Sequence, residues 1–437
     1  MRRMCRIVLV CALLMPLGVS RPSAQASPQI SIEDVELGDG ALARYRAPAA
    51  GVSHIAFLAI HRTNDFRNHQ SAVELANRGF GTLGIRTRFG SNEADVNFEL
   101  IALDIRNGIR YLKNIKKHTR VILVGRSGGG PSTSYYQALA ENGVSYCKGP
   151  NKITECPFTG AEFTPADRAD GIVYTDAHPG VGVNQLRSLN GSVVGQALAP
   201  DTTIDAALDP FDPKHGYNAS GNSVYSAPFI AAYARAQSQR MNDLIRDALQ
   251  IKQNLPPGSK DALFVIAHAS ARLVELGTDV QCCTLKPTRL LLDASGTLSP
   301  PQIIRSVRVP SPGIKDDDAN GSETLTITSF LSANAIRSRH SLDDIDWCSS
   351  NNSTICAARS ISAPTLVLAH QGHYFIRDSE EIYEAAKSAD KEFIVVEGAT
   401  HAGGNCTACA TNHRTGPYVN VLRNTWNYVA NWAKARY

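Results

Sequence analysis

The sequence predicts an α/β fold in which a mostly parallel central sheet is flanked by helices and interrupted by an inserted subdomain. From residue 54 onward, short apolar segments alternate with segments of helical periodicity, which is typical of parallel strands covered by helices on both faces. The alternation stops near Pro179 and resumes at residues 365–369. The stretch between is rich in Pro, Asn, Ser and Asp and too long for a loop, so it is expected to fold as a subdomain.

The first 180 residues contain the first half of the predicted sheet. Two strands joined at Gly38-Asp39-Gly40 are expected to form an antiparallel hairpin. Leu103, Ile109 and Leu112 share the spacing of a helix that lies on a sheet. In chain order the predicted elements are strands at 30–37, 41–47 and 54–61, a helix at 68–78, a strand at 82–88, a helix at 98–115, a strand at 121–124, a helix at 131–141 and a strand at 171–177.

The remaining elements divide between the insertion and the end of the sheet. The insertion contains one clear amphipathic helix, at residues 226–253, with Ser226 as its expected N-cap. After it come strands at 365–369 and 393–396 and helices at 379–387 and 419–436. The predicted domain organisation is therefore a first core segment at 27–180, a cap insertion at 181–362 and a second core segment at 363–437.

The N-terminus of the 437-residue chain has the pattern of a secretory signal peptide. A basic start, MRRMCR, is followed by an apolar run at residues 7–19 and by Ala24-Gln25-Ala26, so cleavage is expected before Ser27. The apolar run is too short to span a bilayer. The expected mature protein is therefore soluble and either secreted or periplasmic.

Removal of residues 1–26 changes the charge balance. Four arginines and no acidic residues leave with the signal, so the 44 basic residues become 40, equal to the 40 acidic ones. A formally neutral chain has no excess positive charge that would attract it to nucleic acid or to an anionic membrane. A small-molecule partner is expected instead.

Cleavage also leaves an even set of eight cysteines, which indicates disulfides in an oxidising compartment. The short loops favour the pairs Cys147/Cys156 and Cys348/Cys356. Cys406-x-x-Cys409 has the spacing of a redox motif, but no thioredoxin-like strand and helix surround it, which favours a structural bridge. The adjacent residues 282 and 283 are expected not to pair with each other, because such a bond is strained.

The segment with the clearest chemistry is Gly125-Arg126-Ser127-Gly128-Gly129, which lies between a predicted strand and a predicted helix. A serine in a tight strand-to-helix turn projects its hydroxyl from the sheet, and small residues two positions on either side let the backbone approach. No Gly-Lys-Ser/Thr follows, so the segment is not a phosphate loop. Its glycine spacing also does not fit a dinucleotide-binding fingerprint. Ser127 is the candidate nucleophile.

These residues resemble the α/β-hydrolase superfamily over roughly residues 30–180 and 362–437. The resemblance rests on Gly125-x-Ser127-x-Gly129, on the strand Pro364-Thr365-Leu366-Val367-Leu368 and on Glu397-Gly398-x-x-His401 after the last strand. It implies a serine hydrolase with a large cap insertion, in which His401 is the base that activates Ser127.

The acid of the implied triad is the position where the sequence departs from the family pattern. The turn that usually carries an Asp is Ala369-His370-Gln371-Gly372-His373-Tyr374 here. Three carboxylates remain as candidates: Asp176, Asp378 and Glu380. Asp176 is chosen because it closes a strand, where a carboxylate is held rigidly within reach of an imidazole. The alternative for Asp176 is a turn cap beside His178 and Pro179.

The resemblance implies an oxyanion hole made by the backbone N–H of Gly128 and by a second N–H after His61. The family's His-Gly is His61-Arg62 here, so the second donor is Arg62 or Thr63. The Arg62 side chain either contacts an acidic substrate or is a surface charge.

The resulting prediction is a secreted serine hydrolase that cleaves an ester or related acyl bond through an acyl-Ser127 intermediate. A cap suggests a bulky, largely apolar substrate. The alternatives are carbon–carbon hydrolysis of a β-diketone by the same residues, a non-catalytic binding protein, and a redox protein that uses Cys406 and Cys409. No cofactor or metal is expected. Asp316, Asp318 and Asn320 match the opening of a calcium loop, but Ile327 stands where its bidentate Glu is required, so a solvated acidic turn is preferred.

Overall fold

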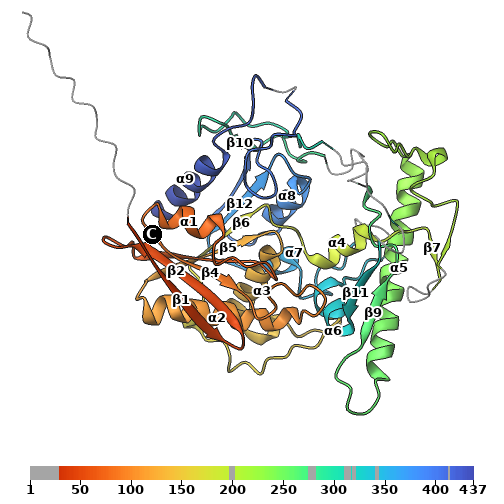
Figure 1. Cartoon of the computed structure of the whole chain (residues 1–437), viewed down its shortest axis with the longest axis horizontal. Helices are drawn as coiled ribbons and strands as arrows, with labels where there is room; N and C mark the ends of the chain where they lie inside the picture. Colours follow the sequence, from red (N-terminus) through yellow and green to blue (C-terminus); the bar gives the residue numbers. More distant parts are fainter. Residues whose placement is uncertain are drawn as a thin grey trace, which may run out of the picture.

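The computed structural model describes residues 29–195, 202–273, 282–309, 316, 321–339, 344–411 and 414–437. Its central feature is a nine-stranded sheet (Figure 1). The expected signal peptide, residues 1–26, lies outside the described residues. In spatial order the strands are β1 (Ile30–Gly38), β2 (Ala41–Pro48), β4 (Gly81–Arg86), β3 (Ile55–Ile60), β5 (Arg120–Arg126), β6 (Gly171–Thr175), β12 (Thr365–His370), β13 (Lys391–Val396) and β10 (Leu290–Leu292). The hairpin β1–β2 joins β4 antiparallel, and every later pair is parallel.

Helices cover both faces of this sheet, as the alternating pattern predicts. One face packs on α1 (Gln70–Ala76) and α9 (Val421–Lys434), around Leu75, Trp426 and Val429. The other packs on α2 (Ile101–Arg110), α3 (Gly129–Asn142) and α8 (Ile376–Ala385). Because both faces are covered, the central strands are buried along almost their whole length.

The insertion forms a separate hydrophobic cluster beside the sheet (Figure 1, right). Its long helix α5 (Ala227–Gln253) begins where the sequence predicts, since the Ser226 side chain accepts a hydrogen bond from the Phe229 N–H. Met241, Leu244 and Phe264 lie in this cluster. The other elements of the insertion are α4 (Val181–Ser188), β7 (Val193–Val194), β8 (Thr203–Ile204), β9 (Leu263–Ile266), β11 (Glu323–Thr326), α6 (Ile327–Ser329) and the π-helical turn η7 (Phe330–Asn334). The last helix of this segment, α7 (Thr354–Ala358), packs on α3 of the core, where Ala357 lies in one hydrophobic cluster with Ala138.

Part of the expected cap at 181–362 belongs to the main sheet. Within it, β10 pairs in parallel with β13 and extends the sheet edge. The segment Leu290-Leu291-Leu292 is too short to give a periodic signal, so only its pairing with β13 marks it as a strand. The predicted helix at 98–115 is likewise built from three pieces, namely a 3-10 turn at Phe98–Leu100, α2, and a π turn at Tyr111–Ile115.

All eight cysteines of the described residues form disulfides. Cys147–Cys156, Cys348–Cys356 and Cys406–Cys409 are paired, as their short loops suggest. The expectation that the adjacent cysteines 282 and 283 would not pair with each other is wrong, because they are bonded to one another. The physical reason is that the other six described cysteines close three local loops, so that each of these two has only its neighbour as a partner among the described residues. Among the helices described, none is both long and apolar enough to cross a membrane.

Candidate active site

Ser127 lies in a strained turn between β5 and α3. Its φ is +52°, a left-handed conformation that a side chain rarely adopts. The flanking glycines explain how the turn fits: a Cβ on Gly125 would lie 2.4 Å from Thr133 Oγ1, and one on Gly129 would lie 2.0 Å from the Ile60 carbonyl oxygen. The turn therefore requires glycine at both positions, and it leaves the Ser127 side chain only partly buried at the end of the sheet.

His401 is carried to Ser127 by the loop after β13. Its Nε2 lies 3.0 Å from Ser127 Oγ. Arg126, the residue before Ser127, donates two hydrogen bonds to the His401 carbonyl oxygen, from Nε at 2.9 Å and from Nη2 at 2.6 Å. Gln70 Nε2 donates to the next carbonyl, that of Ala402, at 2.6 Å. The His401 loop is thus fixed by side chains from β5 and α1.

Asp176 lies directly after β6, and its Oδ2 is 2.5 Å from His401 Nδ1. The carboxylate is fully buried, and the residue has a φ of +46°. The other two candidate acids are bound elsewhere. Asp378 pairs with Arg187 at 2.8 Å, and Glu380 pairs with Arg289 at 2.6 Å. Of the three carboxylates, the structure therefore brings only Asp176 to His401, where it is no mere turn cap.

Two further histidines surround Asp176. His373 Nδ1 lies 2.8 Å from Oδ2 and its ring stacks on that of His401, with centroids 4.3 Å apart. The backbone N–H of His370 donates to Asp176 Oδ1 at 3.3 Å. Burial by itself would raise the pKa of Asp176, but His373, His370 and the hydrogen bond from His401 outweigh it and hold that pKa well below its usual range. Asp176 is therefore charged and positioned to orient the His401 ring.

Asp176, His373 and His401 are also a group that could offer three ligand atoms to a metal ion. Two ligands that share a tetrahedral zinc at about 2.0–2.2 Å stand roughly 3.3 Å or more apart. Asp176 Oδ2 and His401 Nδ1 are separated by 2.5 Å, which is a hydrogen-bond distance. The distance fits a hydrogen bond between Asp176 and His401. These two atoms would have to move apart before they could bind one metal ion.

The backbone near Ser127 offers two free N–H groups. Within the described residues neither the Gly128 N–H nor the Arg62 N–H has a hydrogen-bond partner. The alternative donor, the Thr63 N–H, is occupied, since it donates to His61 Nδ1 at 3.2 Å. Of the two candidate amides, the Arg62 N–H is therefore the one without a partner in the described residues.

The Arg62 side chain points into the protein interface between core and insertion. It is 9% exposed, forms an ion pair with Glu93 and donates from Nη1 to Asn334 Oδ1 at 3.3 Å. The expectation of a surface charge is therefore wrong, because this side chain is buried. Contact of Arg62 with an acidic substrate stays a prediction. The Arg62 side chain packs the π turn η7 of the insertion against the core.

The candidate calcium segment is described only at Asp316, because Asp318 and Asn320 lie outside the described residues. Asp316 does not belong to a solvated turn, since its carboxylate has no exposed area. Oδ2 accepts a hydrogen bond from Asn190 Nδ2 at 2.7 Å, and Oδ1 accepts one from the Ser270 N–H at 3.2 Å. Protein donors satisfy this side chain.

Sequence reasoning missed the groups that hold the site together. Arg126 occupies a variable position of the Gly-x-Ser-x-Gly pattern, and nothing local indicates that it reaches His401. His370 Nδ1 contacts the Thr400 carbonyl at 2.7 Å, and Gln371 Oε1 accepts from the Gly398 N–H at 3.1 Å. The only signal available was the cluster His370-Gln371-Gly372-His373 at the end of a buried strand.

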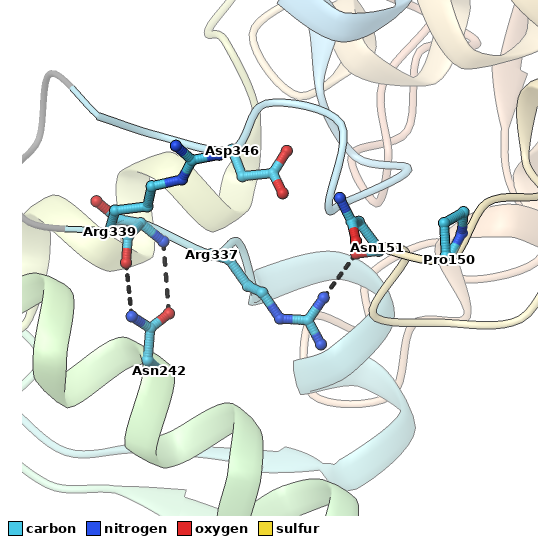
Figure 2. Close-up of a pocket in the computed structure, with 7 residues that line it drawn as sticks. Pro150, Asn151, Asn242, Arg337, Arg339 and Asp346 are labelled. Atoms are coloured by element: carbon cyan, nitrogen blue, oxygen red, sulfur yellow. Dashed lines mark hydrogen bonds between the residues drawn. The ribbon is translucent and has the colours of Figure 1, made fainter.

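A hollow lies between the core and the insertion (Figure 2). It has a volume of about 570 Å³ and is lined by Pro150, Asn151, Asn242, Arg337, Ser338, Arg339 and Asp346. Arg337 donates to the Asn151 carbonyl at 2.6 Å, and the Asn242 amide contacts the Ser338 backbone. The Arg337–Asn151 contact joins core and insertion, whereas the Asn242–Ser338 contact lies within the insertion. The lining of the hollow includes none of Ser127, His401 and Asp176.

Strand order, parallel pairing and a serine on the turn between β5 and α3 together define an α/β-hydrolase fold. No family model matches the sequence, and no curated protein is significantly similar to it. Among solved structures, the chain is similar to brefeldin A esterase, a bacterial homologue of human hormone-sensitive lipase, at 12% identity over 96% of this chain and 80% of that one, with a TM-score of 0.42. It is similar to a siderophore hydrolase from Aspergillus fumigatus at 11% identity over 95% and 98%, with a TM-score of 0.40. A proline iminopeptidase from Mycobacterium smegmatis matches at 11% identity over 93% and 98%, with a TM-score of 0.37.

Proposed function

We propose that the protein is an exported serine hydrolase that cleaves an ester or related acyl bond through an acyl-Ser127 intermediate. The observation that carries the proposal is the continuous chain from Ser127 Oγ to His401 Nε2 at 3.0 Å and from His401 Nδ1 to Asp176 Oδ2 at 2.5 Å. Nδ1 donates to the carboxylate, so Nε2 is free to accept the serine proton.

The chemistry follows from these positions. Ser127 Oγ attacks the acyl carbon while its proton passes to His401 Nε2, and the carbonyl π pair moves onto the oxygen. The free N–H groups of Gly128 and Arg62 would hold this oxyanion. The oxyanion pair then re-forms the carbonyl, the bond from the acyl carbon to the leaving group breaks, and protonated His401 gives its proton to that group. Water repeats the two steps on the acyl-Ser127 ester: it attacks with His401 as base, the acid is released and Ser127 regains its proton. His401 is one-third exposed, which supports access for substrate and water.

Export is part of the same proposal. Its support is the signal-like N-terminus together with four disulfides in the described residues. N-terminal sequencing of the protein purified from the medium or periplasm should begin at Ser27. A chain that keeps Met1, or stays in the cytosol with reduced cysteines, would contradict export.

A fluorophosphonate probe followed by peptide mapping tests the nucleophile. Labelling of Ser127 is expected, with loss of both label and p-nitrophenyl ester hydrolysis in Ser127→Ala and no change in the exposed control Ser145→Ala. An unlabelled Ser127 in folded protein would leave the binding-protein alternative. Product analysis with p-nitrophenyl butyrate and a β-diketone separates acyl from carbon–carbon hydrolysis.

A further inference from the structure

His61 is a buried imidazole beside Ser127 for which the triad has no use. The residue is 7% exposed and its ring stacks on Phe66, with centroids 5.7 Å apart. It directly precedes Arg62, whose N–H is one of the two proposed oxyanion donors. His61 directly follows β3, and Ser127 directly follows β5. Because these two strands are parallel neighbours, both residues lie at the same, carboxyl, end of the strands.

The hydrogen bonds of the ring fix its tautomer. The backbone N–H groups of Thr63 and Asn64 both donate to Nδ1, at 3.2 and 3.0 Å. A nitrogen that accepts two N–H groups carries no hydrogen, so the hydrogen of the neutral ring is on Nε2. Burial, followed by the positive charges of Arg62 and Arg126, lowers the pKa of His61 to about 3, which keeps the ring neutral.

The free end of the ring points at the residue after the nucleophile. His61 Nε2 lies 3.0 Å from the position that a Cβ on Gly128 would occupy. Gly128 therefore leaves room that the imidazole fills, next to the backbone N–H expected to hold the oxyanion. Within the described residues, Nε2 has no hydrogen-bond partner of its own.

We propose that the Nε2–H of His61 is a third donor to the oxyanion, beside the N–H groups of Gly128 and Arg62. When Ser127 Oγ bonds to the acyl carbon and its proton moves to His401 Nε2, the carbonyl oxygen takes the π pair and accepts from all three donors. His61 keeps its proton throughout, because a neutral imidazole is a weak acid that polarises without transfer. This inference rests on the proposed function and makes His61 a catalytic residue of it.

Two substitutions separate this role from simple support of the loop. In His61→Asn the amide oxygen can still accept from Thr63 and Asn64, but no donor replaces Nε2. In His61→Gln the amide nitrogen takes the place of Nε2. With p-nitrophenyl butyrate we expect a loss in kcat of about 10²-fold for His61→Asn, with KM changed less than about threefold, and a smaller loss for His61→Gln.

Binding of a trifluoromethyl ketone that forms an adduct with Ser127 gives a second readout. Its inhibition constant should rise in His61→Asn by the same factor as kcat falls. The matched control is His118→Gln, which should leave kcat unchanged. His118 is also a buried imidazole, 2.9 Å from Tyr45 OH, but it precedes β5 and so lies at the opposite end of that strand from Ser127. Equal losses in the Asn and Gln variants, or an unchanged kcat in folded His61→Asn, would overturn the inference.

A measurement on the unmutated protein keeps the test valid if His61→Asn fails to fold. In the ¹⁵N-labelled protein, the Nε2–H proton of His61 should shift downfield when the trifluoromethyl ketone adduct forms, and an unchanged resonance would overturn the assignment. Fluorophosphonate labelling of the same sample distinguishes the two proposals. If Ser127 is labelled but neither the His61→Asn substitution nor the Nε2–H resonance gives the expected change, only this inference fails. If Ser127 is not labelled, the proposed function fails.

Discussion

Arg126 and His401 are joined by two hydrogen bonds from one guanidinium to one backbone carbonyl oxygen, at 2.9 and 2.6 Å. Arg126 is the last residue of β5 and Ser127 follows it, so a single strand end carries the proposed nucleophile and also anchors the loop of the proposed base. The same guanidinium contacts His69 Nε2 at 3.3 Å through Nη1. This arrangement ties three separate segments to the position of one hydroxyl.

Loss of that anchor is expected to slow the reaction without unfolding the protein. Arg126→Met should lower kcat for a p-nitrophenyl ester by about 10- to 100-fold, because a displacement of about 1 Å at a reacting group can cost that much. The rate of fluorophosphonate labelling should fall in parallel while the melting temperature changes little. Arg120→Met, at the other end of the same strand, is the matched control, and equal rates in the two variants would refute the anchoring role.

The identity of the acid can be tested by three isosteric changes. Asp176→Asn should reduce kcat by about 10⁴-fold, since an amide holds the His401 ring in the wrong tautomer. Asp378→Asn and Glu380→Gln should both leave kcat within about threefold. Asp378→Asn should lower the free energy of unfolding by about 3 kcal/mol, because it leaves the largely buried Arg187 without its carboxylate. Glu380→Gln should lower it less, because Arg289 keeps its ion pair with Glu384. A large kcat loss in Asp378→Asn or Glu380→Gln, with Asp176→Asn active, would reverse the assignment.

Buried histidines should make the folded state sensitive to mild acid. Burial lowers the pKa of His61 and His69 to about 3 and that of His370 to about 4. Unfolded imidazoles protonate near pH 6.5, so below that pH the unfolded chain binds more protons and stability falls as the pH falls. Each such histidine costs about 1.4 kcal/mol per pH unit until its folded pKa is reached.

Urea unfolding at pH 7, 6 and 5 measures this slope. His69→Gln should reduce it by the equivalent of one proton. The depressed pKa of Asp176 does not interfere, because its contribution is lost only below the usual carboxylate range. A free energy of unfolding that stays constant from pH 7 to pH 5 would show that the folded-state histidines are not shielded from protonation.

Gly129, in the turn that carries Ser127, lies so close to the Ile60 carbonyl that we expect the protein not to tolerate even one added methyl group there. In Gly129→Ala the new Cβ would lie 2.0 Å from the Ile60 carbonyl oxygen, so β3 or the turn must move. We expect a loss of about 3 kcal/mol in the free energy of unfolding, together with loss of Ser127 labelling. Gly149→Ala, whose Cβ would meet its nearest neighbour at 3.8 Å, should be neutral, and equal stability of the two variants would contradict the packing argument.

The local sequence pattern was sufficient to predict most of the strands of the sheet and the turn that carries Ser127. The apolar segments before residue 125 and the glycines after it specify strand, bend and helix from interactions within about 20 residues. The cap of α5 at Ser226 is equally local. In contrast, β10 is three residues long and becomes a strand only by pairing with β13, about 100 residues later in the chain.

The sequence by itself determined the fold class, the strained turn and the candidates from which a site could be chosen, because these depend on periodicity and on side-chain size. Only the tertiary structure decided which carboxylate meets His401, that the Arg62 guanidinium is buried between core and insertion, and that Nε2 of His61 faces Gly128. Each of those outcomes depends on contacts between residues far apart in the chain, and a linear pattern contains no distances between such residues.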